Sequence, residues 1–188
     1  GLSSIVAGVL YTGGPYPYGY YGLGDLFVFV YFGLVAVTGT YYVQAVAAVP
    51  GVPVAPPPGS VPADAVVASL AAAALTTAIL VVNNVRDIET DREAGKRTLA
   101  VILGYRWSRV EFLGLLGIAY LVPVALVVAF GYPITVLLPL GSIALAVPVA
   151  RTVLTRTDGE ALNPALERTG QLLALYSALF AAGLALPG

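Results

Sequence analysis

Residues 65–85, AVVASLAAAALTTAILVVNNV, contain no charged side chain, and Arg86 and Asp87 follow them directly. A helix of about 20 apolar residues is long enough to cross the hydrocarbon core of a membrane. Two further uncharged runs, residues 26–49 and 169–188, have comparable lengths. The sequence therefore predicts three membrane-spanning helices from these runs alone.

A longer uncharged run covers residues 112–150 and is interrupted near its middle by Gly131, Tyr132 and Pro133. Glycine and proline favour a turn, so this run predicts two spans. Residues 1–11 are apolar but reach only about half the length of a span, and we expect them to be the end of another helix. The predicted fold class is therefore all-α, an integral membrane helical bundle with about five complete transmembrane helices plus the end of another.

The overall composition agrees with a lipid environment. Hydrophobic residues make up 59% of the 188 residues and charged residues 10%, and the mean hydropathy is +0.89. The sequence lacks Cys and His, which excludes disulfides, thiol nucleophiles and the usual zinc sites. Any metal site must therefore use oxygen ligands. Because the chain contains no Met and begins inside an apolar run, we expect it to be part of a longer protein.

The basic residues indicate which side of the membrane the loops occupy. All nine lie in residues 86–109 and 151–168, and the positive-inside rule places both segments in the cytoplasm. Counting spans backward from them, we expect a multi-pass protein of the cell membrane whose cytoplasmic loops are residues 12–25, 85–109 and 151–165. Residues 50–62, rich in Pro and Val, are then an external loop. With a net charge of −1, no basic surface for nucleic acid is expected.

One cytoplasmic segment carries a regular set of oxygen ligands. Asn83, Asp87 and Asp91 recur every four residues, so on a continuing helix they lie on one face. Like charges at this spacing destabilise a helix by about 0.2–0.5 kcal/mol, and a cation between them would offset that cost. Such oxygen ligands suit Mg²⁺ shared with a substrate phosphate. Basic residues close enough to contact the same phosphate follow directly: Arg92, Lys96 and Arg97.

Other interpretations of this segment fit to different degrees. A solvated helix end, with Glu93 and Arg97 as an i,i+4 ion pair, accounts for the charges without any ligand. An EF-hand is excluded because Arg92 occupies the turn position that requires Gly and Thr98 the final position that requires Glu. A phosphate-binding loop is excluded because Thr90 replaces the upstream Gly. The magnesium and phosphate site and the solvated helix end both stay open.

Residues 83–104, NNVRDIETDREAGKRTLAVILG, closely resemble the second aspartate-rich motif of the UbiA-type intramembrane aromatic prenyltransferases, above all of their menaquinone-pathway branch. Residues 11–33, YTGGPYPYGYYGLGDLFVFVYFG, resemble the same family's loop between its fourth and fifth helices, and the spacing between the two segments also fits. The resemblance covers essentially the whole chain. It implies a bundle of nine spans, in which residues 1–188 form a single membrane domain, the C-terminal two-thirds of such a prenyltransferase.

The resemblance also implies a site. In this family two aspartate-rich motifs hold Mg²⁺ ions that bind the diphosphate of an allylic prenyl donor. Asn83, Asp87 and Asp91 match the metal ligands of the second motif, with Asp87 and Asp91 as the catalytic residues. Residues expected to bind the diphosphate are Tyr11, Arg92 and Lys96.

Three features depart from the family pattern or lack a defined role. The first aspartate-rich motif is missing from these residues, so we expect the chain alone to be inactive. Pro15 and Tyr16 stand where many relatives carry basic residues, which predicts a weaker or differently assembled phosphate clamp. Asp25 matches an acidic position of the loop, and its role is open.

The implied reaction is transfer of a polyprenyl group from polyprenyl diphosphate to 1,4-dihydroxy-2-naphthoate, with loss of CO₂, in menaquinone biosynthesis. Mg²⁺ and cationic side chains stabilise the leaving diphosphate, and an electron-rich ring attacks the allylic cation. The implied cofactor is Mg²⁺, and the implied partners are the two substrates and membrane lipid. Other acceptors stay open: 4-hydroxybenzoate, homogentisate and the glycerol phosphate of archaeal lipids.

Two classes outside enzymes also stay open. A transporter or channel fragment would use carboxylates along an ion path, and it predicts charges deeper within the spans than this sequence has. A purely structural membrane fragment is the other possibility.

Side chains outside the carboxylate segment have alternatives to a role in the site. Aromatic residues at the start of one span could shield an allylic cation, although such residues more often pack in the bundle: Phe27, Phe29, Tyr31 and Phe32. Three residues lie toward the external end of their helix, outside the expected site: Tyr41, Tyr42 and Gln44. Asn163 and Pro164 predict a helix start, with Asn163 as the N-cap.

Overall fold

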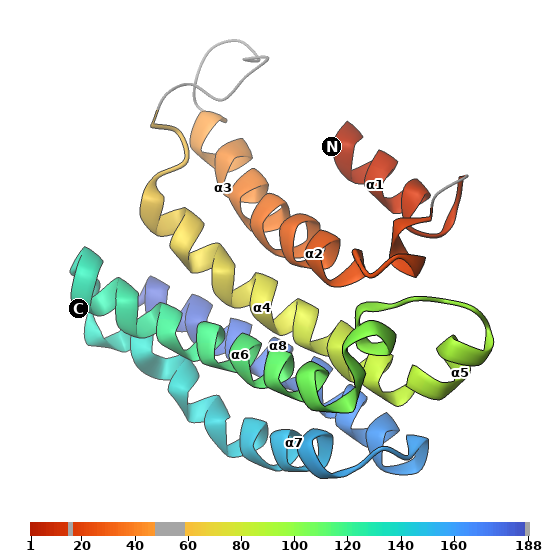
Figure 1. The fold of residues 1–188 in the computed structure, drawn as a ribbon. Helices are drawn as coiled ribbons and strands as arrows, with labels where there is room; N and C mark the ends of the chain where they lie inside the picture. The colour runs from red at the N-terminus through yellow and green to blue at the C-terminus, as the bar shows by residue number, and fades with distance from the viewer. Residues whose placement is uncertain (15–16, 48–58, 187–188) are drawn as a thin grey trace.

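The computed structural model describes residues 1–14, 17–47 and 59–186, which form helices joined by short connections, with no strand among them (Figure 1). In chain order the helices are α1 (Leu2–Thr12), η1 (Tyr18–Tyr20), α2 (Gly24–Val28), η2 (Phe29–Val35), α3 (Ala36–Val46), α4 (Ala63–Arg86), α5 (Ile88–Glu93), α6 (Leu99–Phe130), η3 (Ile134–Ser142), α7 (Ile143–Thr155) and α8 (Gly159–Ala185). The predicted all-α fold class is confirmed. Pro15, Tyr16 and most of the predicted external loop lie outside the described residues.

Four helical stretches are long and apolar enough to cross a membrane: Gly24–Val46, Ala63–Arg86, Leu99–Phe130 and Ile134–Thr155. The first combines α2, η2 and α3, and the last combines η3 and α7. The predicted division of residues 112–150 is confirmed, because α6 ends at Phe130 and η3 begins at Ile134. Leu2–Thr12 forms α1, the short apolar helix expected from residues 1–11 before the first complete span.

The fifth expected span, residues 169–188, is not among these stretches, and the structure describes its residues 169–186. Thr169 lies inside α8, a helix of 27 residues that starts at Gly159. α8 is long enough to cross a membrane, but it is not among the four apolar stretches, and it carries three charged residues, Glu160, Glu167 and Arg168. By length and composition, the described residues therefore contain four candidate spans where the sequence predicted five.

α4 is the central helix of the bundle. In Figure 1 it lies between the α2–α3 helix on one side and α6 and α8 on the other. Four of its alanines are fully buried, Ala71, Ala73, Ala74 and Ala78, and small side chains let neighbouring helices approach closely in a membrane protein. Gly33 of η2 uses this space, because a side chain at that position would overlap Ala73. The alanine-rich run therefore sets how tightly η2 packs on α4.

Polar contacts join the other helices. The Tyr176 hydroxyl of α8 donates to the carbonyl oxygen of Ala119 on α6 at 2.6 Å. Arg109 of α6 donates to the carbonyl oxygens of Val153 and Arg156, at 3.0 and 2.9 Å. These carbonyls lie at the C-terminal end of α7, where backbone acceptors lack partners within the helix. Arg109 therefore caps α7 from a neighbouring helix.

α8 begins earlier than predicted. Its N-cap is Asp158, whose Oδ1 accepts a hydrogen bond from the Ala161 N–H at 2.9 Å. The prediction that Asn163 caps this helix and Pro164 occupies its first position is wrong. Asp is as good an N-cap as Asn, and Pro164 in the second turn removes a single helix hydrogen bond. Asn163 instead lies inside α8, and its Oδ1 accepts a hydrogen bond from Arg86 of α4.

Candidate functional site

The helix that carries the predicted metal ligands is interrupted at Asp87. α4 ends at Arg86, Asp87 has φ −99 and ψ 8, and α5 follows. The Asp87 N–H donates to the Asn83 carbonyl at 3.1 Å, and the Asp91 N–H donates to the Asp87 carbonyl at 2.8 Å. The uninterrupted helix expected here is therefore wrong, but the four-residue repeat of the backbone is kept across the turn.

Arg86 connects two of the predicted ligands to α8. Its guanidinium donates to both carboxylate oxygens of Asp87, each at 2.7 Å. It also donates to Oδ1 of Asn83 at 2.9 Å and to Oδ1 of Asn163 at 3.0 Å. The side chains of Asn83 and Asp87 thus converge on one cation, which in this structure is a side chain of the same chain.

Lys96 holds the third predicted ligand. Its Nζ donates to Oδ1 of Asp91 at 2.9 Å, and Asp91 is buried, with 7% of its surface exposed. The hydrogen bond and the charge of Asp91 raise the pKa of Lys96, and the charge of Asp87 adds to the effect. The Lys96 ammonium also lies 5.5 Å from the centre of the Tyr20 ring, a cation–π distance. Lys96 is therefore charged at neutral pH and neutralises Asp91.

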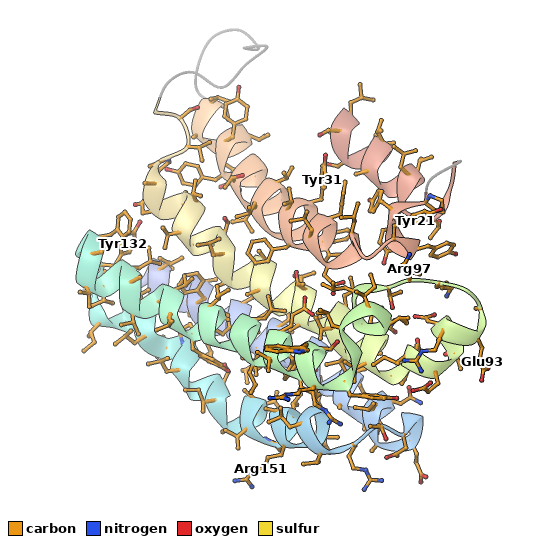
Figure 2. The ribbon with its side chains drawn as sticks, viewed as in Figure 1. Tyr21, Tyr31, Glu93, Arg97, Tyr132 and Arg151 are labelled. Atoms are coloured by element: carbon orange, nitrogen blue, oxygen red, sulfur yellow. The ribbon has the colours of Figure 1, made fainter. Side chains whose placement is uncertain are left out.

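The loop before α2 closes on this segment. The Arg97 N–H donates to the Tyr20 carbonyl at 3.0 Å, and Figure 2 shows Arg97 and Tyr21 near one another, on the α5 side of the molecule. Tyr132 lies at the opposite end of the bundle, where its hydroxyl donates to Oδ2 of Asp64 at 2.7 Å. Two of the loops predicted to share a side of the membrane thus meet at one end of the bundle.

Tyr11 reaches the same site from α1. Its hydroxyl lies against Gly24, close enough that a Cβ there would be 3.4 Å away, and it is within electrostatic reach of Asp25, Asp91 and Lys96. Of the residues predicted to bind diphosphate, Lys96 thus contacts Asp91 directly, and Tyr11 lies against Gly24, in the loop that closes on this segment. Asp25 is 5% exposed, and its Oδ2 has no hydrogen-bond partner within the part of the chain that the structure describes. An open acceptor therefore lies beside Tyr11.

Arg92 lies differently from the other residues predicted to bind diphosphate. Its Nη1 pairs with Oε2 of Glu89 on the solvent side of α5, where the two side chains are 53% and 60% exposed. This pair replaces the Glu93–Arg97 pair of the solvated-helix interpretation. A role for Arg92 in binding diphosphate therefore requires its side chain to leave Glu89.

Two further residues of the site, Arg86 and Asn163, were not predicted as site residues. Arg86 had a visible signal, because it stands directly before Asp87 and shares a helix turn with Asn83. Asn163 is 77 positions from Arg86. Its contact depends on the packing of α8 against α4, which no local sequence pattern encodes.

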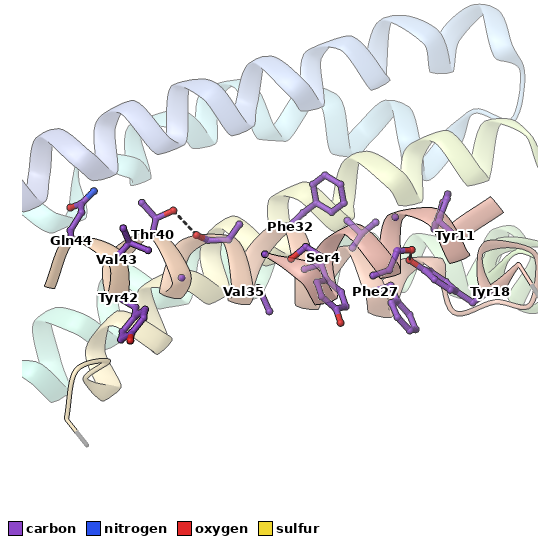
Figure 3. Close-up of a pocket in the computed structure, with 17 residues that line it drawn as sticks. Ser4, Tyr11, Tyr18, Phe27, Phe32, Val35, Thr40, Tyr42, Val43 and Gln44 are labelled. Atoms are coloured by element: carbon purple, nitrogen blue, oxygen red, sulfur yellow. Dashed lines mark hydrogen bonds between the residues drawn. The ribbon is translucent and has the colours of Figure 1, made fainter. Parts of the chain in front are cut away.

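A groove with a volume of about 1150 Å³ lies between α1 and the α2–η2–α3 helix (Figure 3). Tyr11 and Tyr18 line one end of it. Tyr42 and Gln44, expected outside the site, line the other end. Of the aromatic residues considered for shielding a cation, Phe29 packs against the core instead, and three line the groove: Phe27, Tyr31 and Phe32.

A smaller cavity of about 340 Å³ adjoins residues of the groove. Val28 and Phe32 line both spaces, and Asn83 lines the smaller one. The remaining lining residues of the smaller cavity are Thr76, Ile79, Leu80 and Leu166. A largely apolar space therefore reaches one of the predicted metal ligands.

Asn83, Asp87 and Asp91, called the ligand set below, fit a hard divalent cation. Two carboxylates and one amide oxygen are typical ligands of Mg²⁺, which keeps several waters and takes its other ligands from substrate phosphate. Within residues 1–14, 17–47 and 59–186, no group of three or more His, Cys, Asp or Glu side chains forms a metal cluster. The ligand set therefore fits Mg²⁺ that is completed by a phosphate, and does not form an all-protein cage.

Comparison with known proteins identifies the family of the chain. Residues 1–178 match the model of the UbiA prenyltransferase family. The chain is 37% identical over 184 residues to a 1,4-dihydroxy-2-naphthoate octaprenyltransferase of Haemophilus influenzae. The aligned residues are 98% of this chain and 56% of that protein.

Two other relatives give the same result. The chain is 37% identical over 185 residues to the protein of the same name from Mycobacterium tuberculosis, covering 98% of this chain and 58% of that protein. It is 34% identical over 177 residues to UbiA prenyltransferase domain-containing protein 1 of Homo sapiens, covering 94% of this chain and 46% of that protein. The chain spans about half the length of these relatives. On the family match and on these identities, the chain belongs to the UbiA prenyltransferase family.

Proposed function

We propose that this chain is part of a prenyltransferase that transfers a polyprenyl group from polyprenyl diphosphate to 1,4-dihydroxy-2-naphthoate, with loss of CO₂, in menaquinone biosynthesis. The observation that carries the proposal is that Tyr11 lines one end of an aromatic-lined groove and lies within electrostatic reach of the Asp91–Lys96 ion pair. The names of the bacterial relatives supply the acceptor. Residues 1–188 are then a single membrane domain, the C-terminal part of such an enzyme.

In this proposal the chain's own residues bind the leaving group. Lys96 contacts Asp91, and Tyr11 lies within electrostatic reach of both, so an ammonium and a hydroxyl group would donate to the phosphate oxygens. Arg92 would join them from α5. Mg²⁺ held by the ligand set would stabilise negative charge on the diphosphate as it leaves.

The groove gives the prenyl chain an apolar place to lie. Phe27, Tyr31 and Phe32 are among the residues that line it, and aromatic rings stabilise a nearby cation. An allylic cation formed at the Tyr11 end of the groove would therefore be shielded from water, which would otherwise capture it. Attack by the electron-rich acceptor ring needs no nucleophile from the protein.

The proposed topology places the ligand set on the cytoplasmic side of the cell membrane, with loops 12–25, 85–109 and 151–165. The positions of three basic residues support this topology, because they lie where spanning helices begin or end: Arg86, Lys96 and Arg156. The positive-inside rule assigns such an end to the cytoplasm. A second aspartate-rich motif would have to come from outside these residues, so we expect no prenyl transfer by this chain alone.

A different acceptor is the alternative within the same enzyme class, because the diphosphate site would be unchanged by it. A transporter is less well supported. The acidic residues inside the candidate spans are Asp25, Asp64 and Glu111. Asp25 and Asp64 lie in the first turn of their spans, and Glu111 begins the last 20 residues of α6, a length that is about one full span. An ion path through the membrane centre requires charges deeper than these.

Product analysis tests the acceptor. The protein, extended at its N-terminus to the length of its relatives, is incubated in membranes with Mg²⁺, polyprenyl diphosphate and each candidate acceptor in turn. We expect a prenylated product from 1,4-dihydroxy-2-naphthoate whose mass shows the loss of CO₂. Product from 4-hydroxybenzoate or homogentisate alone would contradict the acceptor, and no product from any of them would contradict prenyl transfer.

A further inference from the structure

The ligand set is already neutralised by side chains of the same chain. Arg86 donates two hydrogen bonds to Asp87 and one to Asn83, at 2.7, 2.7 and 2.9 Å. Lys96 donates one to Asp91 at 2.9 Å. Two carboxylates therefore face two cations, and all three predicted ligands are engaged.

The neighbouring charges do not supply a substitute partner. Glu89 and Arg92 pair with each other on the exposed face of α5. Asp25, another carboxylate near the site, interacts electrostatically with Tyr11 and takes no part in these ion pairs. The charge balance of the ligand set therefore depends on Arg86 and Lys96.

A bare divalent cation competes poorly for such a cluster. It would have to displace Arg86 from the oxygens of Asp87, and hydrogen bonds between charged groups are the strong ones, especially in bidentate pairs. It would also add two positive charges beside a guanidinium and an ammonium that have lost their partners. Both effects oppose binding of the metal by itself.

A diphosphate reverses this balance. Its oxygens accept hydrogen bonds from both groups, and a guanidinium matches phosphate geometry in bidentate fashion. The side chains of Arg86 and Lys96 are 24% and 38% exposed, so both can turn toward a phosphate without leaving a packed core. The oxygens of Asp87 and Asp91 then become available to a metal.

We propose, building on the diphosphate site proposed above, that Arg86 and Lys96 make binding of a divalent cation conditional on the diphosphate. Without diphosphate these two side chains occupy the ligand set, and when it binds they transfer to the phosphate oxygens. The prenyl donor and its cation therefore enter together. Asn163 anchors Arg86 to α8 at 3.0 Å, which keeps the guanidinium close to the ligand set.

Binding of Mn²⁺ alone and of preformed Mg²⁺–pyrophosphate separates this proposal from a structural role. Mn²⁺ is followed by electron paramagnetic resonance and Mg²⁺–pyrophosphate by titration calorimetry, on detergent-purified wild type, Arg86→Gln and Lys96→Gln. We expect each variant to bind bare Mn²⁺ roughly tenfold more tightly and Mg²⁺–pyrophosphate roughly tenfold more weakly. Damage to the fold would weaken both.

Arg156→Gln is the matched control, because it removes a cation that pairs with Asp158 at 2.8 Å, outside the ligand set. We expect it to change neither affinity. Affinity for bare Mn²⁺ that is unchanged or weaker in either Arg86→Gln or Lys96→Gln overturns the proposal, as does a wild type that does not bind Mg²⁺–pyrophosphate. Neither measurement uses a prenyl donor or an aromatic acceptor, so a failure of prenyl transfer would count against the proposed function alone.

Discussion

At the scale of single residues, the pairing of Asp91 with Lys96 has a direct energetic consequence. The Asp91 side chain is 10% exposed and the Lys96 side chain 38%. Lys96→Met leaves a buried carboxylate without its cation, and we expect the free energy of unfolding to fall by about 1–2 kcal/mol, a modest value because Lys96 is partly solvated. Thermal unfolding in detergent measures the loss.

The second substitution Asp91→Asn provides the control for this prediction. A neutral amide needs no counter-charge, so Asp91→Asn combined with Lys96→Met should recover most of the lost stability. A Lys96→Met protein that melts with the wild type would show that this ion pair does not stabilise the fold.

The residue types of the ligand set could be predicted from the sequence, and their charge partners could not. The four-residue spacing groups Asn83, Asp87 and Asp91, and the backbone hydrogen bonds of the structure keep that spacing. Arg86 and Asn163 meet only after α4 and α8 have packed, over a separation of 77 residues. Local patterns carry no information on such contacts.

At the scale of elements, α6 contains a break that depends on one residue. Gly104 has φ 70 and ψ 175, a region of backbone conformation that is essentially restricted to glycine. We expect Gly104→Ala to lower the free energy of unfolding by about 1–3 kcal/mol, although no atom stands within 4 Å of the added Cβ. Gly117→Ala, farther along the same helix and equally free of contacts, should not destabilise. Equal unfolding temperatures for the two variants would refute this account of the break.

The start of α8 gives a prediction of pH dependence. The hydrogen bond from Arg156 and that from the Ala161 N–H lower the pKa of Asp158 to about 2, whereas an unfolded Asp titrates near about 3.9. Because the folded-state pKa is the lower one, the stabilisation is present above about pH 4 and is lost as the pH falls toward 2. We expect the unfolding temperature to drop over this range, and to drop less in Asp158→Asn, which does not titrate. If the unfolding temperatures of the wild type and Asp158→Asn fall in parallel with pH, titration of Asp158 is not the cause of the loss.

The apolar runs predicted which segments form helices. The ends of the helices depend on local hydrogen bonds, which the apolar runs do not indicate. The uncharged residues 65–85 lie within α4, which begins two residues earlier, at Ala63, and ends one residue later, at Arg86. The start of α8 was misplaced because Asp158 and Asn163 are equally good N-caps by residue type. The bond from Ala161 to Asp158 and the bond from Arg86 to Asn163 distinguish them.

At the scale of the whole molecule, the close approach of η2 to α4 holds the groove-forming helix on the bundle. A Cβ on Gly33 would overlap Ala73, so Gly33→Ala must push the two helices apart. We expect a loss of about 1–3 kcal/mol in the free energy of unfolding, the usual cost of overpacking. Gly39→Ala lies on the same continuous helix with no atom near its Cβ and should leave the unfolding temperature unchanged. Equal unfolding temperatures for Gly33→Ala and Gly39→Ala would show that the contact of Gly33 with Ala73 does not set the packing of η2 on α4.

The groove itself was beyond prediction from the sequence. Phe27, Tyr31 and Phe32 could be recognised as aromatic residues at the start of a span, but Phe29, two positions away, packs on the core instead. Which aromatic residues face the groove depends on how the π-helical segment η2 turns the helix and where α1 lies. Both are properties of the assembled bundle.

The claim that the ligand set serves prenyl transfer is tested most directly by one assay. Prenyl transfer from polyprenyl diphosphate to 1,4-dihydroxy-2-naphthoate is measured in membranes, with and without Mg²⁺, for the N-terminally extended protein, Asp87→Asn, Asp91→Asn and the control Asp64→Asn, whose carboxylate bonds Tyr132 at the other end of the bundle. We predict magnesium-dependent product from the wild type and the control, and rates at least roughly 100-fold lower from Asp87→Asn and Asp91→Asn. Wild-type rates from those two variants would contradict the account.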